Sequence, residues 1–469
     1  MPGINHDSGA SRFTFPMKKL AIFALALSWI SIAHAQNFTT SGAQILKDGA
    51  PVQLRGANAL HEYGVGSSDM NAWKIDIVRE TIHNFGSHPI TGNPVQIGGV
   101  WKHSLQNILN DNRANGKVTI LCPFNWDGTP STDFLGKNPS QQGWWNAYKT
   151  RYQAVANQFK NQSDVWFDVW NEPYWWDAND PRGYSESLWL SDMRAMADNI
   201  RATGAQNIIL IPGSRMGQKE TVILNQGRNL LSGRANLVFG LHAYEDWLYG
   251  SQSQIEARIA GVQNLGLPFL FGEYGAQNND TMDVANLLAA CRAKRVGALA
   301  WIWKKSDSER GALLRSDGTT PNDVGNFQYG TKVKGFCLEA RSTELVKNGD
   351  FPVDLSNWSV FSATGTATVS GAQLRLGTGS SGGGVSQNLA PKANTQHVLS
   401  AKGRVGIAGE KVTVTVKGDG FSYALDFNTA TMTTKTLNFT TPASATWFQV
   451  QVWKSAGSFG YADDISVAR

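Results

Sequence analysis

From residue 50 to about residue 340, short apolar runs rich in strand-forming residues alternate with longer segments of helical period. Eight runs predict strands, at residues 52–58, 74–80, 117–124, 165–172, 207–213, 237–244, 268–275 and 298–305. Four of the segments between them repeat apolar residues at i, i+3 and i+4, which predicts helices at 144–160, 186–204, 253–266 and 284–297. Three of these four segments end in glycine, as helices often do.

Eight strands that alternate with helices over roughly 250–300 residues have the size and rhythm of a (β/α)8 barrel. A doubly wound open sheet is the alternative, but it would usually carry a phosphate-binding loop at its first turn. The segment RGANALHEYG (55–64), which ends the first predicted strand, is not such a loop. The predicted fold class is therefore α/β, with a (β/α)8 barrel domain over residues 36–341.

After about residue 342 the helical period disappears, and apolar residues alternate with polar ones at a period of two. The alternating runs lie at 367–377, 411–418, 434–442, 447–455 and 462–469. This pattern predicts an all-β sandwich or jelly roll over residues 342–469. The glycine-rich run 377–384 lacks a lysine and a following helix, so we interpret it as a turn rather than a phosphate loop.

A hydrophobic leader precedes both regions. The segment MKKLAIFALALSWISIAHA, from Met17, has two lysines, an apolar centre and small residues at Ala33 and Ala35. These features predict a secretory signal peptide that is cleaved after Ala35, and the polar residues before Met17 indicate that Met17 is the true start. A hydrophobic N-terminal helix is the alternative. We expect residues 1–35 to be a leader and the mature chain to be secreted, to the extracellular space or the periplasm.

The charge balance excludes two classes of partner. The chain has 469 residues, of which 41% are hydrophobic and 17% charged, an ordinary globular composition. Without residues 1–35 it carries 39 basic and 36 acidic side chains and has no basic run. This distribution argues against nucleic acid or anionic lipid as the main partner. No later stretch has the length and apolarity of a membrane anchor.

The cysteines predict neither a disulfide scaffold nor a zinc site. Cys122, Cys291 and Cys337 are few and odd in number, and their spacing matches no zinc pattern. Cys122 lies in a strand-like run and is expected to be a small buried hydrophobic residue. We therefore expect no cofactor in the barrel domain.

In a (β/α)8 barrel, polar groups at the carboxyl ends of the strands converge on one mouth, where the chemistry takes place. The predicted strand ends bring to this mouth Asn58, His61, Arg79, Asn171, Glu172, His242, Tyr244, Glu273 and Trp303. Two carboxylates, Glu172 from strand four and Glu273 from strand seven, thus face one cavity. Either glutamate alone would be consistent with an ion pair or a helix cap. Two of them beside an arginine, a histidine and a tyrosine indicate a catalytic pair.

Paired carboxylates across a cavity are what glycoside hydrolysis requires, because one donates a proton to the leaving oxygen while the other attacks the anomeric carbon. Arg79 and Tyr244 are expected to keep Glu273 ionised, by charge attraction and by a hydrogen bond. Glu172, which is surrounded by aromatic residues, is the better proton donor. The 17 tryptophans agree with such a function, because indole rings are flat, apolar and able to hydrogen-bond, as sugar faces are.

The motifs VWNEPYW (169–175), LHAY (241–244) and LFGEYG (270–275) resemble those of glycoside hydrolase family 5, retaining enzymes on a (β/α)8 barrel that cut β-linked polysaccharides. The resemblance extends over about residues 45–335. It implies that Glu172 is the acid/base and Glu273 the nucleophile. The further substrate contacts that it implies come from Asn171 at the 2-hydroxyl group, from Arg79, His242 and Tyr244, and from Trp303 beneath the reacting sugar.

The resemblance implies an endo-β-1,4-glycanase, with β-1,4-glucan as the first substrate and β-1,4-mannan as the second. Many family members carry a histidine at the end of strand three, where this chain has Phe124 and Asn125, so the subsite there differs. A non-catalytic polysaccharide-binding protein is the alternative from another class, and the presence of both glutamates argues against it. The expected partner is a plant-type β-linked polysaccharide, and the chain is expected to act as a monomer.

Three further tryptophans follow catalytic strands in predicted loops, where they either bind sugar or pack the loops. They are Trp175, Trp176 and Trp247. Of these we expect Trp247 to contact substrate, together with Asn58 and His61 at the end of strand one. A polar side chain that is satisfied within the fold is the alternative for His61.

The C-terminal segments ELVKNGDF, NWSV and YADDISV resemble β-sandwich carbohydrate-binding modules of the family 4/9/22 type. Such modules often hold a structural calcium ion near their joined termini, which implies Asp350 and Asp464 as ligands, although Pro352 stands where an acidic residue is common. Exposed aromatic residues would bind the sugar; the candidates are Trp358, Phe421, Tyr423, Trp447 and Trp453. A stabilising sandwich without a ligand is the alternative.

Overall fold

The computed structural model describes residues 37–97, 99–176, 182–276, 282–325, 327–339, 344–363, 365–378 and 380–469. The predicted leader at residues 1–35 lies outside the described residues and stays a prediction. Within these ranges, the helices are too short or too polar to cross a lipid bilayer.

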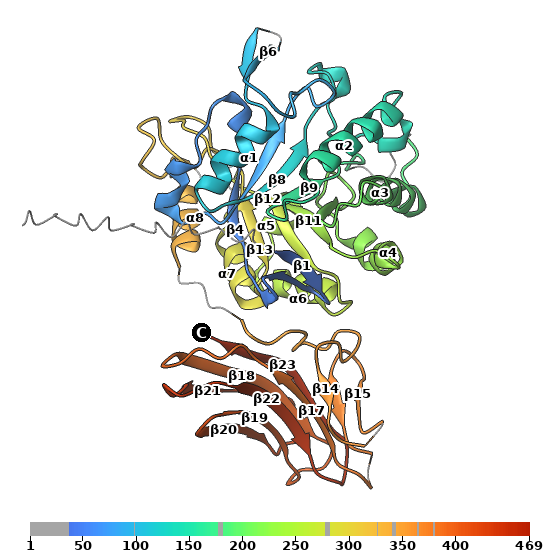
Figure 1. The fold of residues 1–469 in the computed structure, drawn as a ribbon, viewed down its shortest axis with the longest axis vertical. Coiled ribbons are helices and arrows are strands. Elements are labelled where there is room, and N and C mark those ends of the chain that lie inside the picture. The colour runs from blue at the N-terminus through green and yellow to red at the C-terminus, as the bar shows by residue number, and fades with distance from the viewer. Residues whose placement is uncertain are drawn as a thin grey trace, which may run out of the picture. The chain divides into compact units, whose positions relative to one another are not determined.

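Eight parallel strands form a closed barrel (Figure 1). In chain order they are β4 (Arg55–Ala59), β5 (Ile77–Ile82), β8 (Val118–Pro123), β9 (Val165–Asp168), β10 (Ile209–Pro212), β11 (Leu237–Ala243), β12 (Phe269–Tyr274) and β13 (Gly297–Ala300). Neighbours in the chain are neighbours in the barrel, and β13 closes it by pairing with β4. Each of the eight predicted runs overlaps one barrel strand, so the predicted fold class is confirmed.

Helices in the strand connections surround the barrel (Figure 1). They are α1 (Leu105–Ala114), α2 (Trp145–Phe159), α3 (Glu186–Arg201), α4 (Thr221–Leu231), α5 (Glu245–Leu248), α6 (Gln252–Gln263), α7 (Ala285–Lys294) and α8 (Tyr329–Leu338). The four predicted helices correspond to α2, α3, α6 and α7. The first connection instead contains the short 3-10 helices η1 (His61–Tyr63) and η2 (Ser68–Trp73). Two further 3-10 helices, η3 (Pro130–Thr132) and η4 (Pro139–Gln141), lie in the connection between β8 and β9.

A small antiparallel sheet that the sequence did not predict closes the amino-terminal end of the barrel. Its strands are β1 (Phe38–Ser41), β2 (Gln44–Lys47) and β3 (Ala50–Pro51). Phe38 belongs to the apolar cluster that fills the barrel, and its ring meets Trp166 edge to face at 5.4 Å. The opposite, carboxyl-terminal end is thereby left as the end where polar side chains gather.

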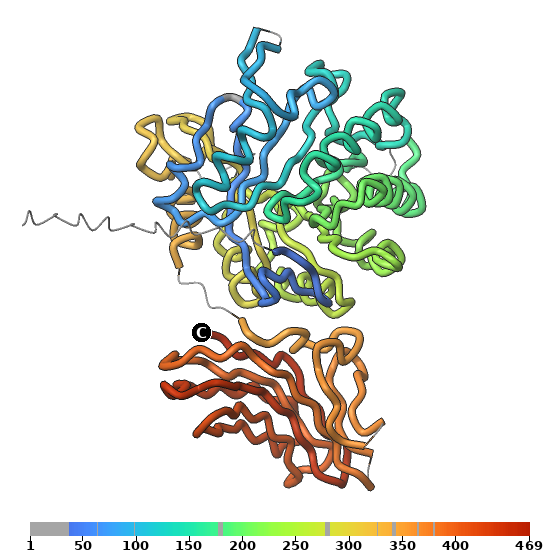
Figure 2. The backbone as a smooth tube through the Cα atoms, viewed as in Figure 1, coloured from blue at the N-terminus to red at the C-terminus, as the bar shows by residue number. Residues whose placement is uncertain are grey.

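The second domain consists of two five-stranded antiparallel sheets, seen as the orange-to-red part of the trace in Figure 2. One sheet has the order β14 (Ser359–Val360), β17 (Gly383–Asn388), β22 (Phe448–Lys454), β19 (Val412–Gly418) and β20 (Phe421–Phe427). The other has the order β15 (Ala367–Val369), β16 (Leu374–Leu376), β23 (Gly460–Ala468), β18 (Gln396–Val405) and β21 (Thr433–Thr440). The predicted all-β domain is confirmed, whereas its predicted boundary at residues 341/342 lies outside the described residues.

The period of two along these strands separates a core face from an outer face. In β19, for example, Val412, Val414 and Val416 are fully buried, and Thr413 and Thr415 between them are partly exposed. The inward side chains form a single apolar cluster between the sheets. The domain therefore has a core of its own.

Candidate active site

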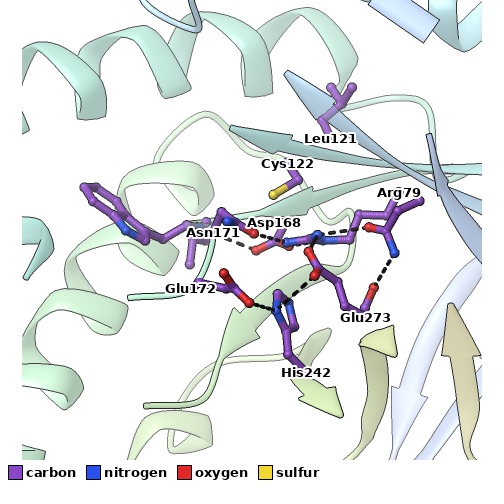
Figure 3. A network of polar contacts seen from close by, with 12 residues as sticks. Arg79, Leu121, Cys122, Asp168, Asn171, Glu172, His242 and Glu273 are labelled. Atoms are coloured by element: carbon purple, nitrogen blue, oxygen red, sulfur yellow. Dashed lines mark hydrogen bonds and ion pairs between the residues drawn. The ribbon is translucent and has the colours of Figure 1, made fainter. Parts of the chain in front are cut away.

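Two glutamates meet a histidine at the carboxyl end of the barrel (Figure 3). Glu172 follows β9, Glu273 lies in β12, and His242 lies opposite Glu273 in the neighbouring strand β11. One carboxylate oxygen of each glutamate and one ring nitrogen of His242 all lie within 4.8 Å of one another. The structure thus brings together the two carboxyl groups that the sequence placed on strands four and seven. Carboxyl groups about 5–5.5 Å apart are typical of retaining glycosidases, and separations of about 6.5–9.5 Å are typical of inverting ones.

The backbone at Glu172 adopts a conformation that an L-residue seldom takes. Its φ is 47°, in the left-handed region, and its carbonyl oxygen accepts a hydrogen bond of 2.7 Å from the Gly136 amide. Such a residue costs of order 1–3 kcal/mol, and positions of this kind cluster at functional sites. The turn between β9 and Pro173 therefore directs this one carboxyl group toward His242.

Arg79, in β5, is the centre of the polar network beneath the glutamates. It is fully buried, and its Nη1 lies 2.6 Å from Glu273 Oε1 while its Nε lies 2.8 Å from Asp168 Oδ2. The guanidinium also donates to Asn58 Oδ1 at 3.0 Å and to Asn171 Oδ1 at 2.9 Å. Buried side chains such as Arg79 and Asn58 have no surface to offer a substrate. They hold Glu273 and Asn171 in place, which is a positioning role rather than the substrate contact expected for them.

Glu273 has three partners that favour its ionised form. Besides the Arg79 guanidinium, the Tyr244 hydroxyl donates to Glu273 Oε2 at 2.8 Å, and His242 Nδ1 lies 3.5 Å from the same oxygen. Burial raises the pKa of Glu273 above its ordinary value, and these three partners act in the opposite direction. A buried carboxylate 2.6 Å from a guanidinium remains the anionic half of an ion pair.

Glu172 is in a different electrostatic environment. Burial, reinforced by the charge of Glu245 and opposed by Arg79, raises the pKa of Glu172 to about 8. Its Oε1 lies 2.8 Å from Nδ1 of His242, and burial lowers the pKa of that histidine to about 4. At neutral pH a protonated Glu172 therefore faces a neutral imidazole, while Glu273 faces a cation. The two carboxyl groups are held in opposite protonation states.

Asp168 is a residue of this network that the sequence reasoning missed. It is the last residue of β9 and shares Arg79 with Glu273, so a second carboxylate balances the guanidinium. The signal was present in the segment FDVWNE, where an acidic residue interrupts an apolar strand four residues before Glu172. Cys122, also drawn in Figure 3, is buried as predicted. Cys291 and Cys337 are likewise buried, and neither forms a disulfide bond within the part of the chain that the structure describes.

Two predicted substrate contacts are not supported by the structure. His61 is buried, with Nδ1 2.7 Å from Glu80 Oε1 and Nε2 3.4 Å from Asp111 Oδ2, so its ring is held by carboxylates of the scaffold. Trp247 is fully buried; its indole N–H donates to the Gln218 carbonyl, and the Arg258 guanidinium covers its ring at 3.5 Å. The polar atoms of both side chains have their partners within the scaffold, so both side chains pack the loops that follow strands one and six.

The tryptophan expected beneath the reacting sugar is also buried. Trp303 is 3% exposed and packs edge to face against Trp73 at 5.1 Å. A ring that stacks on a sugar needs an exposed face, whereas a buried carboxylate such as that of Glu273 needs only one accessible oxygen. At the same strand end, Trp301 is partly exposed, and its ring lies parallel to Phe124 at 5.8 Å. Trp301 is therefore the better-placed ring, and the segment AWIWKK contained both tryptophans.

Two tryptophans of the loop after β9 remain accessible. Trp176 is 58% exposed, and Trp175 is partly buried, with the Arg182 guanidinium 4.8 Å above its ring. Both stay candidates for sugar contact.

Two groups of side chains have donor atoms suited to a cation. Glu172, His242 and Glu273 present three ligand atoms within 4.8 Å, but these are the same atoms that the hydrolytic reaction requires. In the second domain, Asp350 Oδ1 is buried without a hydrogen-bond partner, and burial raises the pKa of Asp350 to about 6. Asp464 Oδ2 instead lies 2.6 Å from Lys402 Nζ. Calcium binding by Asp350 and Asp464 stays a prediction.

Comparison with known proteins identifies the family. The family model for cellulase, glycosyl hydrolase family 5, matches residues 45–307. This match covers more than half of the chain, and the chain therefore belongs to glycosyl hydrolase family 5. The predicted family is confirmed for the barrel; the match ends before the sandwich.

Three relatives illustrate what the chain is similar to. It is 24% identical to a mannan endo-1,4-β-mannosidase of Streptomyces lividans over 269 residues, 54% of this chain and 64% of that protein. It is 25% identical to a β-mannanase/endoglucanase A of Caldicellulosiruptor saccharolyticus over 167 residues, 35% of this chain and 12% of that protein. The chain thus spans less than two thirds of either relative. The structure of a β-mannanase from Thermomonospora fusca, 18% identical, superposes with a TM-score of 0.51, covers 65% of this chain and 98% of its own, and supports the barrel fold.

Proposed function

We propose that the protein is a retaining endo-β-1,4-glycanase with Glu273 as nucleophile and Glu172 as acid/base. The observation that carries the proposal is the pair of glutamates within 4.8 Å whose neighbours hold them in opposite protonation states. Ionised Glu273 attacks the anomeric carbon, and the carboxyl proton of Glu172 passes to the leaving glycosidic oxygen. In the second step Glu172, now a carboxylate, removes a proton from water, and the water oxygen displaces Glu273 from the anomeric carbon.

The proposed substrates are β-1,4-glucan and β-1,4-mannan. The sequence prediction places glucan first. The name of one relative, a mannan endo-1,4-β-mannosidase, supports mannan, and that of another, a β-mannanase/endoglucanase, supports both. Glucose and mannose differ only in the configuration at carbon 2. Asn171, which is fixed by Arg79 and is proposed to bind the 2-hydroxyl group, is thus the residue placed to sense the difference.

The test is hydrolysis of a panel of carboxymethyl cellulose, mixed-linkage β-glucan, glucomannan, galactomannan and xylan, with the product anomer followed by NMR. We expect reducing-end release from at least one β-1,4-glucan or mannan and initial formation of the β-anomer. Initial formation of the α-anomer would contradict the retaining mechanism. Binding without any release of reducing ends would favour the non-catalytic alternative.

We also propose that the chain is secreted and that its sandwich domain binds polysaccharide. Secretion is supported by the leader from Met17 to Ala35, and N-terminal sequencing of the exported protein is expected to begin at Gln36. Sugar binding is supported by exposed aromatic residues on the sandwich, among them Trp447 and Trp453, which are 45% and 42% exposed. Trp358, in contrast, is buried in the core and is not available to a ligand.

A further inference from the structure

A buried carboxylate outside the catalytic pair organises the loop that follows strand two of the barrel. Glu62 is fully buried, and its carboxylate oxygens lie 2.5 Å from Nδ1 of His83, 3.3 Å from Nδ1 of His88 and 3.5 Å from Nζ of Lys102. The proposed reaction does not use this cluster. A buried carboxylate with several polar partners is costly to assemble, and such clusters often hold a functional side chain in one orientation.

The partly exposed member of this cluster is His83. It directly follows β5, the strand that carries Arg79, so it lies at the same end of the barrel as the glutamates. Its side chain is 28% exposed. Both its backbone and its ring are fixed by Glu62, because the His83 amide donates to Glu62 Oε2 at 3.1 Å while Nδ1 faces Oε1.

The ring of His83 continues a row of aromatic rings across the mouth of the barrel. Its centroid lies 5.6 Å from that of Phe124 at the end of β8, and the Phe124 ring is parallel to Trp301 after β13. All three side chains are partly exposed. Aromatic faces bind the C–H faces of a pyranose, and an imidazole adds a group that can hydrogen-bond a hydroxyl.

We propose that His83, held by Glu62 as a positioning residue, and Phe124 form a subsite for a sugar unit next to the one being cleaved. This inference rests on the proposed function, because it takes a β-linked polysaccharide as the substrate. The reacting sugar lies at Glu172 and Glu273, on strands four and seven. His83 and Phe124 directly follow strands two and three and therefore meet a neighbouring unit of the same polysaccharide.

The experiment compares aryl β-glycosides with one, two and three sugar units in the glycone, built from the sugar that the wild-type enzyme cleaves. Each additional sugar unit that the subsite binds should raise kcat/KM. His83→Ala is expected to reduce this gain by about tenfold, which corresponds to the loss of one hydrogen bond. The loss should appear mainly in KM, and the one-unit glycoside should lose least. His83→Gln, which keeps a hydrogen-bonding group, should recover part of the gain.

Glu62→Gln tests the positioning role. Glu62→Gln should cause the same length-dependent loss of kcat/KM as His83→Ala. In the double variant Glu62→Gln/His83→Ala this loss should be no larger than in His83→Ala alone, because both changes act on one interaction. His103→Ala is the matched control, since it changes another partly buried histidine of the same loop, and it should keep the wild-type length profile.

Equal losses on all three glycosides, or no loss in His83→Ala, would overturn the subsite. If Glu62→Gln lowers the melting temperature and slows all glycosides equally, Glu62 is only structural and the positioning claim fails. The two His83 variants still test the subsite if Glu62→Gln does not fold. A wild-type enzyme that cleaves neither these glycosides nor the polysaccharide panel would instead contradict the proposed function.

Discussion

The side chains of Glu172 and Glu273 differ less in chemistry than in surroundings, and their roles follow from that difference. Glu273 is 2.6 Å from a guanidinium, whereas Glu172 is 2.8 Å from an imidazole that is neutral at pH 7. This difference in surroundings is the basis for the proposed roles, in which the carboxyl group of Glu273 is the nucleophile and that of Glu172 the proton donor.

The acid role of Glu172 predicts a dependence on the leaving group. Glu172→Ala should slow the hydrolysis of natural oligosaccharides by about 10²–10⁴-fold, because an unassisted alkoxide is a poor leaving group. Aryl glycosides with acidic phenols need no proton and should lose far less in the step that breaks the glycosidic bond. The measurement is the pre-steady-state rate of phenol release against phenol pKa, and a slope unchanged from wild type would remove Glu172 from this role.

The raised pKa of Glu172 also predicts a pH profile. Activity requires Glu172 protonated and Glu273 ionised, so kcat/KM should fall as the pH rises through about 8, where Glu172 loses its proton. At lower pH, kcat/KM should fall when Glu273 becomes protonated. Because burial raises the pKa of Glu273, this acid limb should lie above the ordinary pKa of a glutamate. Because Glu172 and Glu273 interact, the two apparent pKa values of the profile describe the pair and not either residue alone.

Glu172→Gln provides the control for this profile, since its amide does not titrate. With an activated aryl glycoside the basic limb should disappear, and the acid limb should remain. A basic limb that persists in Glu172→Gln would assign it to another group.

At the scale of single residues, the sequence predicted correctly the position of those side chains that lie at a strand end. Glu172, Glu273, His242 and Tyr244 converge because the carboxyl ends of parallel strands meet at one mouth. The errors at His61 and Trp247 have a different origin. Both follow a strand end within a short helix, and only the packing of that helix decides whether a side chain faces the mouth or the scaffold.

At the scale of elements, period and composition located all eight strands because each is buried on both faces and lies in a short run rich in apolar residues. The helices α1 and α4 keep apolar residues at helical spacing, such as Leu105, Ile108 and Leu109 in α1. They were missed because the asparagines between these apolar residues are typical of turns. The sheet β1–β3 was missed because strands of two to four residues give too short a pattern.

This small sheet yields a prediction about stability. Phe38 is 2% exposed and packs on Trp166 at the amino-terminal end of the barrel, away from the glutamates. Phe38→Ala should lower the free energy of unfolding by about 3–5 kcal/mol, because it removes a buried ring and leaves a cavity. Denaturant titration measures this change. At a temperature where the variant is folded, its kcat should stay near the wild-type value.

Trp101→Ala is a suitable control, because Trp101 lies in the hairpin of β6 (Val95–Ile97) and β7 (Val100–Lys102) and is 63% exposed. It should change the free energy of unfolding by less than about 0.5 kcal/mol. An equal loss in both variants would mean that the sheet β1–β3 contributes no specific packing.

At the scale of the whole molecule, the chain combines a hydrolase barrel with a sandwich that has its own core. If the sandwich binds polysaccharide, as proposed, the combination gives an advantage on a solid polymer, because a bound module raises the local concentration of the catalytic domain without changing its chemistry. The sandwich has a surface suited to this task. On the outer side of the sheet that contains β22, Trp453 stacks on Phe361 at 5.8 Å, and both rings are more than two fifths exposed.

Truncation near residue 342 and Trp453→Ala in the full chain test this division of labour together. If the sandwich binds polysaccharide through this surface, both changes should lower adsorption to, and hydrolysis of, insoluble glucan or mannan, while kcat/KM on soluble oligosaccharides stays close to wild type. Trp453→Ala should leave the melting temperature nearly unchanged, because the ring is exposed. If the sandwich instead braces the barrel, truncation should lower the melting temperature and reduce activity on soluble and insoluble substrates alike, and Trp453→Ala should do neither. Adsorption isotherms, soluble kinetics and thermal unfolding on the same three proteins separate these outcomes, because only a binding surface links a loss on the solid polymer to an unchanged rate in solution.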